Sequence, residues 1–359
     1  MDVLFAPVTY NSYDPEETLP VRFTRLLERS PLKDSVKGKT VAIKCHVGDK
    51  LSFTTIAPVF IRLLVKFIQD NGGNCFVTDH YMWIRQPQER GYTPEILGCP
   101  VVDDCGHTEK YFVTKEVDYQ SFKHVDIAGE IYHADYFVNL SHVKGHGSCG
   151  YGGAVKNIAM GCVTDRTRQE IHGLFGGLEW DKEKCTHCEA CIKSCNHDAN
   201  SFNEAGEYEI MDHNCTLCHH CDKVCPTGAI KITDSKYYDF QHGMALCTKT
   251  VLDNFGDNAY HVNVLTNITA VCDCWGMSTP SLVPDIGIMA GKDVVAVEQA
   301  SLDAIKVENF IPQGAPGGKL VGNTGHLFER LHSISPYVQL DALQELKVGS
   351  RQYSLVEVR

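Results

Sequence analysis

The sequence contains no long hydrophobic run and no excess of basic residues. Its longest mostly apolar stretch, Ile56–Ile68, is interrupted by Arg62 and Lys66, and it is shorter than the ~20 apolar residues that cross a bilayer. The 33 Lys and Arg residues are outnumbered by 45 Asp and Glu residues, for a net charge of −12, whereas nucleic-acid binders normally carry a basic surface. We therefore expect an acidic protein that uses neither a membrane nor nucleic acid.

The N-terminus also lacks the basic segment and apolar segment of a secretion signal. An odd count of 17 cysteines in 359 residues does not fit a secreted disulfide scaffold either. We expect reduced thiols, a cytoplasmic location and cysteines that are available to bind metal. With 43% apolar residues, the chain is long enough to form two or three folding units.

Eight cysteines form two runs of the same spacing, C-x2-C-x2-C-x3-C. The runs are Cys185, Cys188, Cys191, Cys195 and Cys215, Cys218, Cys221, Cys225. This spacing is that of bacterial two-cluster ferredoxins, in which the fourth cysteine of each run binds the other cluster. It predicts two [4Fe–4S] clusters, one on Cys185, Cys188, Cys191 and Cys225, the other on Cys215, Cys218, Cys221 and Cys195. Zinc could bind the C-x2-C pairs, but it would not explain two complete matching runs.

The segments around these runs alternate between strand and helix patterns. We expect strands over Thr40–His46, Asn74–Thr78, Tyr136–Leu140, His261–Leu265 and Val294–Val297. We expect helices capped by Thr54 or Thr55, over Phe240–Asn254, and from about Ser301. Alternating strands and helices predict an α/β fold with a mostly parallel sheet.

The same pattern predicts a discontinuous host domain. Residues 1–177 and 236–359 would form its two parts, and residues 178–235 a small α+β ferredoxin-like insert with the two clusters. The segment Pro312–Gly325 contains two prolines and five glycines, which predict a loop.

A second concentration of reactive side chains lies in the host, at Ser141–Gly161. It holds six glycines, two histidines, two lysines and a cysteine. Glycine lets the backbone approach a ligand and lysine neutralises an anion, so we expect a phosphate or carboxylate site. The candidate binding residues are Lys144, Gly147, Gly152, Gly153 and Asn157. Residues 145–150 match G-x-G-x-x-G without the acidic partner of dinucleotide sites; a tight structural loop is the alternative.

The run Cys272-Asp273-Cys274 is the other unusual feature of the host. In an extended strand both thiols would point to the same face. They could then share a metal ion or form a redox pair, or they could be a buried structural pair. Cys45 and His46 are weaker candidates for the same site.

The segments GHGSCGYGGAVKNIAMG and CDCWGMSTPSLVPDIGIMAGKDVVAVEQA, together with the insert, resemble the domain of unknown function 362 family. This resemblance covers nearly the whole chain and implies an iron–sulfur protein without a settled reaction.

The run from His146 to Lys156-Asn157 also resembles, more distantly, the lactate racemases that use a nickel-pincer nucleotide. That resemblance implies His146 and His80 as acid/base residues, Lys156 as the cofactor tether and His172 as a metal ligand. Because that family lacks the ferredoxin insert and the Cys272/Cys274 pair, a shared fold with different chemistry is the preferred interpretation.

Three functions follow from these features. In the first, the clusters relay electrons from a redox partner protein to a metal or anionic ligand near His146, Lys156 and Cys272/Cys274. The chain would then be an oxidoreductase, or a cofactor-maturation factor, for an unknown small molecule. In the second, it is a non-catalytic electron carrier that docks to a redox partner. In the third, it is a pincer-cofactor enzyme similar to the racemases.

Overall fold

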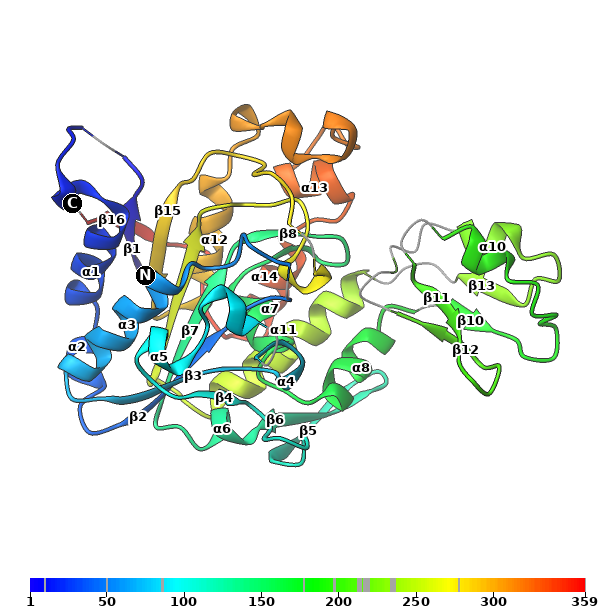
Figure 1. Cartoon of the computed structure of the whole chain (residues 1–359), viewed down its shortest axis with the longest axis horizontal. Helices are drawn as coiled ribbons and strands as arrows, with labels where there is room; N and C mark the ends of the chain where they lie inside the picture. Colours follow the sequence, from blue (N-terminus) through cyan, green and yellow to red (C-terminus); the bar gives the residue numbers. More distant parts are fainter. Residues whose placement is uncertain are drawn as a thin grey trace.

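An eight-stranded sheet forms the centre of the host (Figure 1). The computed structural model describes the chain except residues 10, 50, 85–86, 177, 196–197, 212–214, 216–219, 233–236, 277 and 359. In sheet order, the strands are β16 (Ser354–Glu357), β1 (Asp2–Pro7), β15 (Gly287–Gly291), β14 (Ala259–Leu265), β7 (Tyr136–His142), β2 (Thr40–Cys45), β3 (Asn74–Asp79) and β4 (Val101–Asp103). All neighbours are parallel except the pairs that β15 makes with β1 and β14. The predicted α/β fold with a mostly parallel sheet is confirmed.

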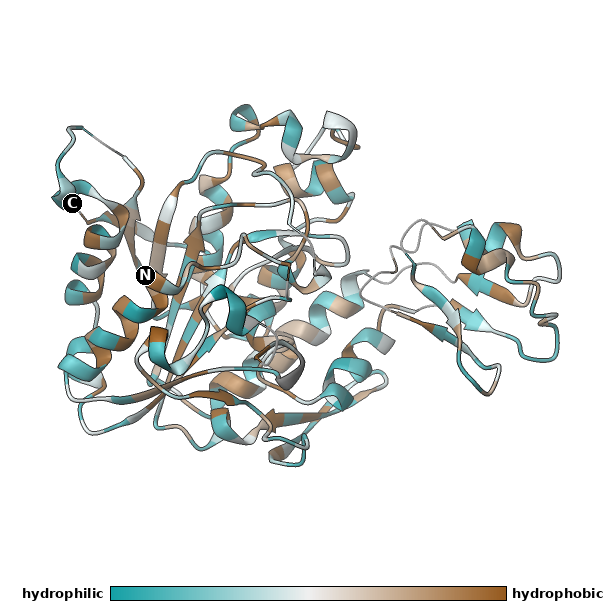
Figure 2. Cartoon of the chain, viewed as in Figure 1, coloured by the Kyte–Doolittle hydropathy of each residue, from teal (hydrophilic) through white to brown (hydrophobic). Residues whose placement is uncertain are grey.

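Helices cover both faces of this sheet. Those of the host are α1 (Leu19–Arg29), α2 (Leu32–Ser35), α3 (Pro58–Asp70), α4 (Tyr81–Ile84), α5 (Pro94–Leu97), α6 (Gly129–Tyr132), α7 (Ala154–Ala159), α8 (Asp165–Gly173), α11 (Tyr237–Asp253), α12 (Val294–Ala304), α13 (Leu327–His332) and α14 (Val338–Glu345). Val41 and Ile43 of β2 pack in the core shared with α1 and α3, whereas Ala42 packs in the core shared with α11. Successive strand residues therefore pack into the cores on opposite faces of the sheet, and the apolar strands lie between the two helix layers (Figure 2). Among the described residues, no helix has the length and hydropathy required to span a membrane.

Several predicted elements are present, and three differ from the prediction. Strands β2, β3, β7 and β14 and helix α11 lie where the sequence predicts them. The expected strand Val294–Val297 is instead the first turn of α12, because the Asp293 side chain accepts hydrogen bonds from the Val295 and Ala296 amides at 2.9 and 3.0 Å. Ser301 therefore lies within that helix rather than at its start.

The helix expected from Thr54 or Thr55 begins only at Pro58. The Thr55 hydroxyl instead bonds the Ser52 carbonyl and the Tyr92 hydroxyl, which keeps the segment before α3 as a loop. The segment Pro312–Gly325 contains two short 3-10 turns, η5 (Pro312–Gly314) and η6 (Pro316–Gly318).

Two hairpins lie beside the sheet. They pair β5 (Phe112–Tyr119) with β6 (Phe122–Ala128), and β8 (Lys144–His146) with β9 (Gly150–Gly152). The second hairpin carries the glycine-rich segment directly after β7, so it lies at the carboxyl end of a central strand.

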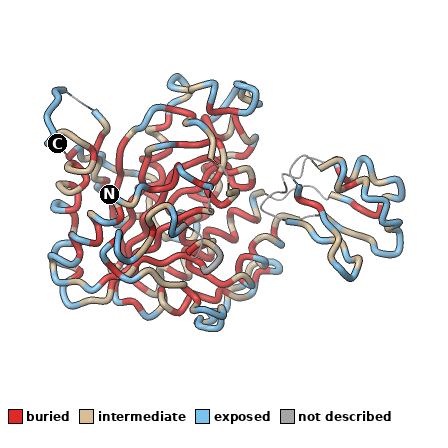
Figure 3. The backbone as a smooth tube through the Cα atoms, viewed as in Figure 1, coloured by how far each residue is buried: buried red, intermediate tan, exposed pale blue. Residues whose placement is uncertain are grey.

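The segment between α8 and α11 forms a small lobe that projects from the host (Figure 1). Its elements are β10 (Leu178–Trp180), α9 (Ala190–Lys193), β11 (Asn200–Phe202), β12 (Tyr208–Ile210), α10 (His220–Val224) and β13 (Ile230–Ile232). Its described buried apolar core consists of Cys191, Cys221 and Ile230 with partly buried neighbours, whereas the host is densely buried (Figure 3). So small a core needs a further source of stability, such as bound metal. The predicted boundary at residue 235 lies outside the described residues.

The pairing of β1 with β15 places a strict requirement on Gly287. Its φ is +144°, and a Cβ there would lie 2.1 Å from the Ala6 carbonyl oxygen. We expect Gly287→Ala to lower the free energy of unfolding by about 1–3 kcal/mol, measured by urea denaturation followed by circular dichroism. Gly173→Ala is the control, because nothing lies within 4 Å of its added Cβ. Equal stability of the two variants would contradict this assignment.

Candidate thiol and histidine site

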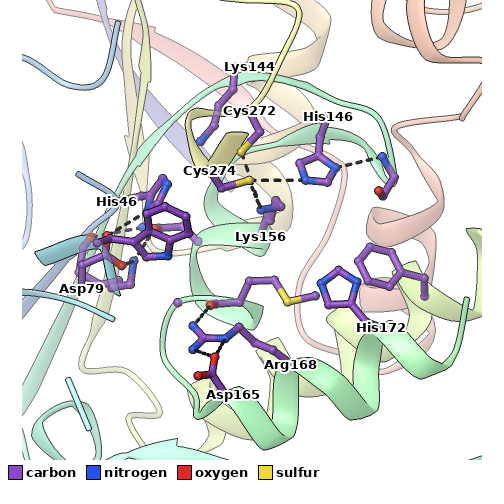
Figure 4. A pocket seen from close by; sticks show the side chains of 17 residues that line it. His46, Asp79, Lys144, His146, Lys156, Asp165, Arg168, His172, Cys272 and Cys274 are labelled. Atoms are coloured by element: carbon purple, nitrogen blue, oxygen red, sulfur yellow. Dashed lines mark hydrogen bonds and ion pairs between the residues drawn. The ribbon is translucent and has the colours of Figure 1, made fainter. Parts of the chain in front are cut away.

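The parallel strands β2, β3 and β7 end at one edge of the sheet, where α/β proteins commonly bind ligands. His46 directly follows β2, Asp79 ends β3 and His142 ends β7. A partly open pocket lies at this edge (Figure 4). It is lined by Lys44, His46, Asp79, Trp83, Lys144, His146, Ser148, Lys156, Asn157, Met160, Gly161, Asp165, Arg168, His172, Phe240, Cys272 and Cys274.

Two thiols converge at one side of this pocket. Cys272 precedes the 3-10 turn η3 (Asp273–Trp275), so the two cysteines do not lie on an extended strand. The turn nevertheless brings the two Sγ atoms together, and the Cys274 thiol hydrogen-bonds Cys272. Lys156 Nζ from α7 lies 3.8 Å from Cys272 Sγ and 3.7 Å from Cys274 Sγ.

An imidazole completes this arrangement (Figure 4). His146 Nε2 lies 4.0 Å from Cys274 Sγ. The Ser148 amide donates a hydrogen bond to His146 Nδ1 at 3.0 Å, so the proton of a neutral His146 is on Nε2 and faces the thiol. We refer to Cys272, Cys274, Lys156 and His146 as the thiol cluster.

The surrounding charges favour one thiolate in this cluster. Burial raises the pKa of Cys272, but the hydrogen bond from Cys274 and the charges of Lys156 and Lys144 outweigh it and hold that pKa well below the usual range. The hydrogen bond to Cys272 and burial raise the pKa of Cys274. Burial lowers the pKa of Lys156, but Cys272 and Cys274 outweigh it, so that pKa is raised. The pair therefore holds one negative charge beside a lysine ammonium.

Asp273 fixes the turn that carries the two cysteines. Its Oδ2 lies 2.8 Å from His142 Nδ1 and 3.2 Å from Lys144 Nζ, and all three side chains are buried. Burial raises the pKa of Asp273, but His142 and Lys144 lower it well below its usual range. Lys144, predicted as an anion-binding residue, also donates to the His142 carbonyl at 3.0 Å, so it holds the turn against β7.

The glycines of the glycine-rich segment Ser141–Gly161 leave space for side chains of the protein itself. A Cβ at Gly153 would lie 2.5 Å from Glu298 Oε2, and one at Gly152 would lie 3.1 Å from Lys156 Cδ. Gly147 packs near Trp275. Glu298 accepts a hydrogen bond from the Val155 amide at 2.7 Å and thereby fixes the start of α7. Within the described lining of the pocket, Gly147, Gly152 and Gly153 are not present.

Asn157 lines the pocket, and its amide is already used within the host. Its Nδ2 donates to Asn139 Oδ1 at 2.7 Å, and its Oδ1 accepts from Lys44 Nζ at 2.8 Å. It therefore ties α7 to β2 and β7.

The two other predicted histidines lie in different surroundings. His172 of α8 lines the pocket across from the thiol cluster (Figure 4), and its ring centroid is 5.2 Å from that of Phe240. His80 is buried outside the described lining, with Nε2 3.5 Å from Glu109 Oε1 and 3.8 Å from Asp165 Oδ1. Burial and the charge of Arg168 lower the pKa of His80. The structure thus brings His172, but not His80, to the pocket that holds the thiol cluster.

Asp79 is not among the site residues predicted from the sequence, and His46 is only a weak candidate there. The Asp79 carboxylate lies 2.9 Å from His46 Nδ1 and 2.9 Å from Lys44 Nζ. The available signal was their position, because both residues stand at the carboxyl ends of strands that the sequence predicts to be neighbours.

The lobe contains a second, small cavity lined by cysteines from both runs: Cys185, Cys188, Cys191 and Cys225. Of the other predicted set, Cys221 is buried and Cys195 and Cys215 are partly buried. The Ala199 amide donates to Cys195 Sγ at 3.3 Å. Cys218 lies outside the described residues.

These features define an α/β protein with a small cysteine-rich lobe and a thiol cluster at the sheet edge. The family model described as Domain of unknown function (DUF362) matches residues 41–303. The chain therefore belongs to this family, and the predicted family resemblance is confirmed.

Short segments are similar to iron–sulfur and redox proteins. The archaeal-type glutamate synthase [NADPH] of Thermotoga maritima is 34% identical over 61 residues, which cover 17% of this chain and 12% of that protein. Ferredoxin-3 of a Nostoc strain is 32% identical over 78 residues, covering 14% of this chain and 80% of the ferredoxin. These similarities indicate an iron–sulfur redox protein, although the chain spans a small part of the synthase.

The lactate racemase apoprotein of Thermoanaerobacterium thermosaccharolyticum overlaps this structure with a TM-score of 0.39 at 15% identity. The overlap covers 69% of this chain and 49% of the racemase. No residue role is transferred from it.

The charges around Cys272 predict a thiolate that persists below the ordinary cysteine range. In metal-free protein, the iodoacetamide reaction rate at Cys272 should stay constant from neutral to mildly acidic pH, because the lowered pKa keeps the thiolate form. The rate of a reference cysteine peptide should fall about tenfold per pH unit. Tandem mass spectrometry of the alkylated peptide measures both. Lys156→Met should restore pH dependence at Cys272, and a wild-type rate that follows the reference peptide would contradict the assignment.

Proposed function

We propose that this protein is an iron–sulfur oxidoreductase in which two [4Fe–4S] clusters in the lobe exchange electrons with the thiol cluster of the host pocket. A redox partner protein would supply or accept the electrons, and a small molecule would bind in the pocket. The observation that carries this proposal is the convergence of two thiols, a lysine ammonium and an imidazole in one pocket.

The lobe fits the clusters that its cysteine spacing predicts. Its described buried core is very small, and four cysteines from the two runs surround one cavity. Cys185, Cys188, Cys191 and Cys225 would hold one cluster, and Cys215, Cys218, Cys221 and Cys195 the other. When bound, such clusters supply one-electron transfer.

The position of the pocket supports a connection with the lobe. The chain enters the lobe after α8 and leaves it before α11, and each helix contributes a lining side chain, His172 and Phe240. The Phe175 and Phe240 rings stack at 4.3 Å between centroids. The two host helices that precede and follow the lobe in the chain therefore contribute to one wall of the pocket.

The thiol cluster is suited to a two-electron couple. When the Cys272 thiolate and the Cys274 thiol form a disulfide, one S–S bond forms, two electrons leave and one proton is released. Two one-electron cluster sites match this electron count. Lys156 stabilises the reduced form, because its ammonium neutralises the thiolate that the disulfide lacks.

A metal site is the second candidate, since ligand atoms of His146, Cys272 and Cys274 all lie within 4.8 Å of one another. Two thiolates and one imidazole could bind Zn²⁺ or a related ion with an open position. A metal-bound histidine usually donates its other N–H to an acceptor, whereas His146 Nδ1 accepts from the Ser148 amide. This hydrogen bond favours the thiol pair over the metal.

A metal inventory of protein purified without oxygen tests both candidates. We expect about eight iron atoms per chain and no other metal near stoichiometry. The matched variants are Cys272→Ser and Cys247→Ser. The first replaces a thiol of the thiol cluster, and the second replaces a buried thiol of α11 outside it. Both should retain the iron. A further metal lost only in Cys272→Ser would establish the metal site, and iron far below eight would contradict the cluster proposal.

The potential of the thiol pair provides an independent test. Lys156→Met should lower the midpoint potential by about 30 mV or more, since loss of about 1.4 kcal/mol of thiolate stabilisation shifts a two-electron couple by that amount. Equilibration in glutathione buffers followed by alkylation and mass spectrometry measures the disulfide fraction. The iron content should not change, and an unchanged or raised potential would contradict the role of Lys156.

A further inference from the structure

A histidine outside the thiol cluster faces the same pocket. His46 Nδ1 lies 2.9 Å from Asp79 Oδ2, and Asp79 also accepts from the Val47 amide at 3.1 Å. Lys44 Nζ lies 2.9 Å from Asp79 Oδ1. Because a carboxylate only accepts hydrogen bonds, His46 Nδ1 carries a proton. The Trp83 ring packs against the His46 ring in a T-shaped arrangement, with 5.3 Å between the ring centroids.

The other ring nitrogen of His46 is left for a ligand. Within the described part of the chain, no hydrogen-bond partner lies near Nε2, although that atom is buried. The His46 side chain is 13% exposed, and it lines the pocket together with the thiol cluster. A buried imidazole nitrogen without a partner is costly in free energy, so its retention points to a bound molecule.

A second buried Asp–His pair in the same site provides an internal comparison. Asp273 Oδ2 contacts His142 Nδ1 at 2.8 Å, and Lys144 contacts the same carboxylate. His142 Nε2 faces the Thr266 and Asn267 carbonyl oxygens at 2.9 and 3.2 Å. Both nitrogens of His142 therefore donate to fixed acceptors, and this ring has no free position for a substrate. His46 has an equivalent aspartate and lysine at its inner nitrogen, but among the described residues its outer nitrogen has no hydrogen-bond partner.

We propose that His46 is the proton-transfer residue of the pocket, with Asp79 as its positioning residue, acting on an oxygen atom of a small neutral hydroxy or carbonyl compound. The inference goes beyond the proposed function, because it assigns proton transfer to a group that the thiol chemistry does not use. Nε2 takes one proton from a hydroxyl group, which leaves an alkoxide oxygen and an imidazolium ring, and in the reverse direction the imidazolium returns that proton to the alkoxide oxygen. Asp79 stays ionised throughout, since Lys44 neutralises it.

The charge pairing among the side chains that line the pocket indicates an uncharged ligand. Lys44 pairs with Asp79, Lys144 with Asp273, and Arg168 with Asp165. Lys156 is held at the two thiols. Within the described lining, these four cations already have partners, so a hydroxyl or carbonyl group suits the pocket better than a phosphate. The charged groups that act on His46 are Asp79, Lys44 and Asp273.

The test uses the full chain labelled with ¹⁵N-histidine. We expect the NMR signal of His46, assigned by its loss in His46→Gln, to show Nδ1 protonated and Nε2 unprotonated. His142 should show both nitrogens protonated. Diethyl pyrocarbonate should modify His46 at Nε2 and leave His142 unmodified. A protonated Nε2 in neutral His46, or loss of selectivity for His46, would overturn the proposal.

Asp79→Asn tests the positioning role, because an asparagine can donate its amide to Nδ1 and thereby move the proton to Nε2. Diethyl pyrocarbonate modification of His46 should then be lost. If this variant does not fold, the wild-type spectrum still decides the tautomer. Cys272→Ser should leave the His46 signals unchanged, so failure of the thiol proposal is distinguishable from failure of this one.

Two probes test the ligand class. Dihydroxyacetone should shift the Nε2 signal of His46, and inorganic phosphate should not. A shift with phosphate alone, or with neither probe, would overturn the assignment of a neutral hydroxy or carbonyl ligand.

Discussion

The site depends on one buried carboxylate, that of Asp273. It stands between the two cysteines in sequence, and its contacts with His142 and Lys144 tie the cysteine turn to the end of β7. Removing one partner from such a buried ion pair typically costs 3–5 kcal/mol, because the remaining charges are left without compensation. The Ser52 hydroxyl adds a contact to the Asp273 carbonyl oxygen at 3.0 Å. Asp273 therefore connects the loop after β2, the end of β7 and the two thiols. The positive charge of Lys144 lowers the pKa of both Asp273 and Cys272.

Features that depend on neighbouring residues were predictable from the sequence. The β-branched, apolar run Thr40–Cys45 forms a strand, and the cysteine runs are typical of a ferredoxin because their spacing is local. Contacts between distant residues were not predictable in this way. Asp273 pairs with His142 across 131 positions, and Asp79 pairs with His46 across 33. No local pattern distinguishes either aspartate from an ordinary turn residue, so the residues that organise the site were missed while its nucleophiles and cations were noticed.

In two segments the tertiary contacts decide between local possibilities that the composition leaves open. Val294–Val297 is apolar and β-branched, yet one carboxylate at Asp293 satisfies two amides and starts a helix there. The glycine-rich segment was interpreted as ligand-binding because glycine permits close approach. The approaching groups are instead Glu298, Lys156 and Trp275. In both cases composition correctly indicated an unusual backbone requirement, and only the tertiary contacts determine which group meets it.

The two Lys–Asp–His arrangements show how the same local chemistry serves different purposes. Lys44, Asp79 and His46 and, across the pocket edge, Lys144, Asp273 and His142 have similar inner distances of 2.8 to 3.2 Å. They differ in the outer nitrogen, which faces fixed carbonyl groups in His142 and has no hydrogen-bond partner among the described residues in His46. An imidazole with two fixed acceptors stabilises structure, whereas one with a single fixed acceptor can exchange a proton. Because the Lys144–Asp273–His142 arrangement holds the thiols and the Lys44–Asp79–His46 arrangement lines the pocket beside them, electron and proton chemistry can meet at one bound molecule without competing for the same residues.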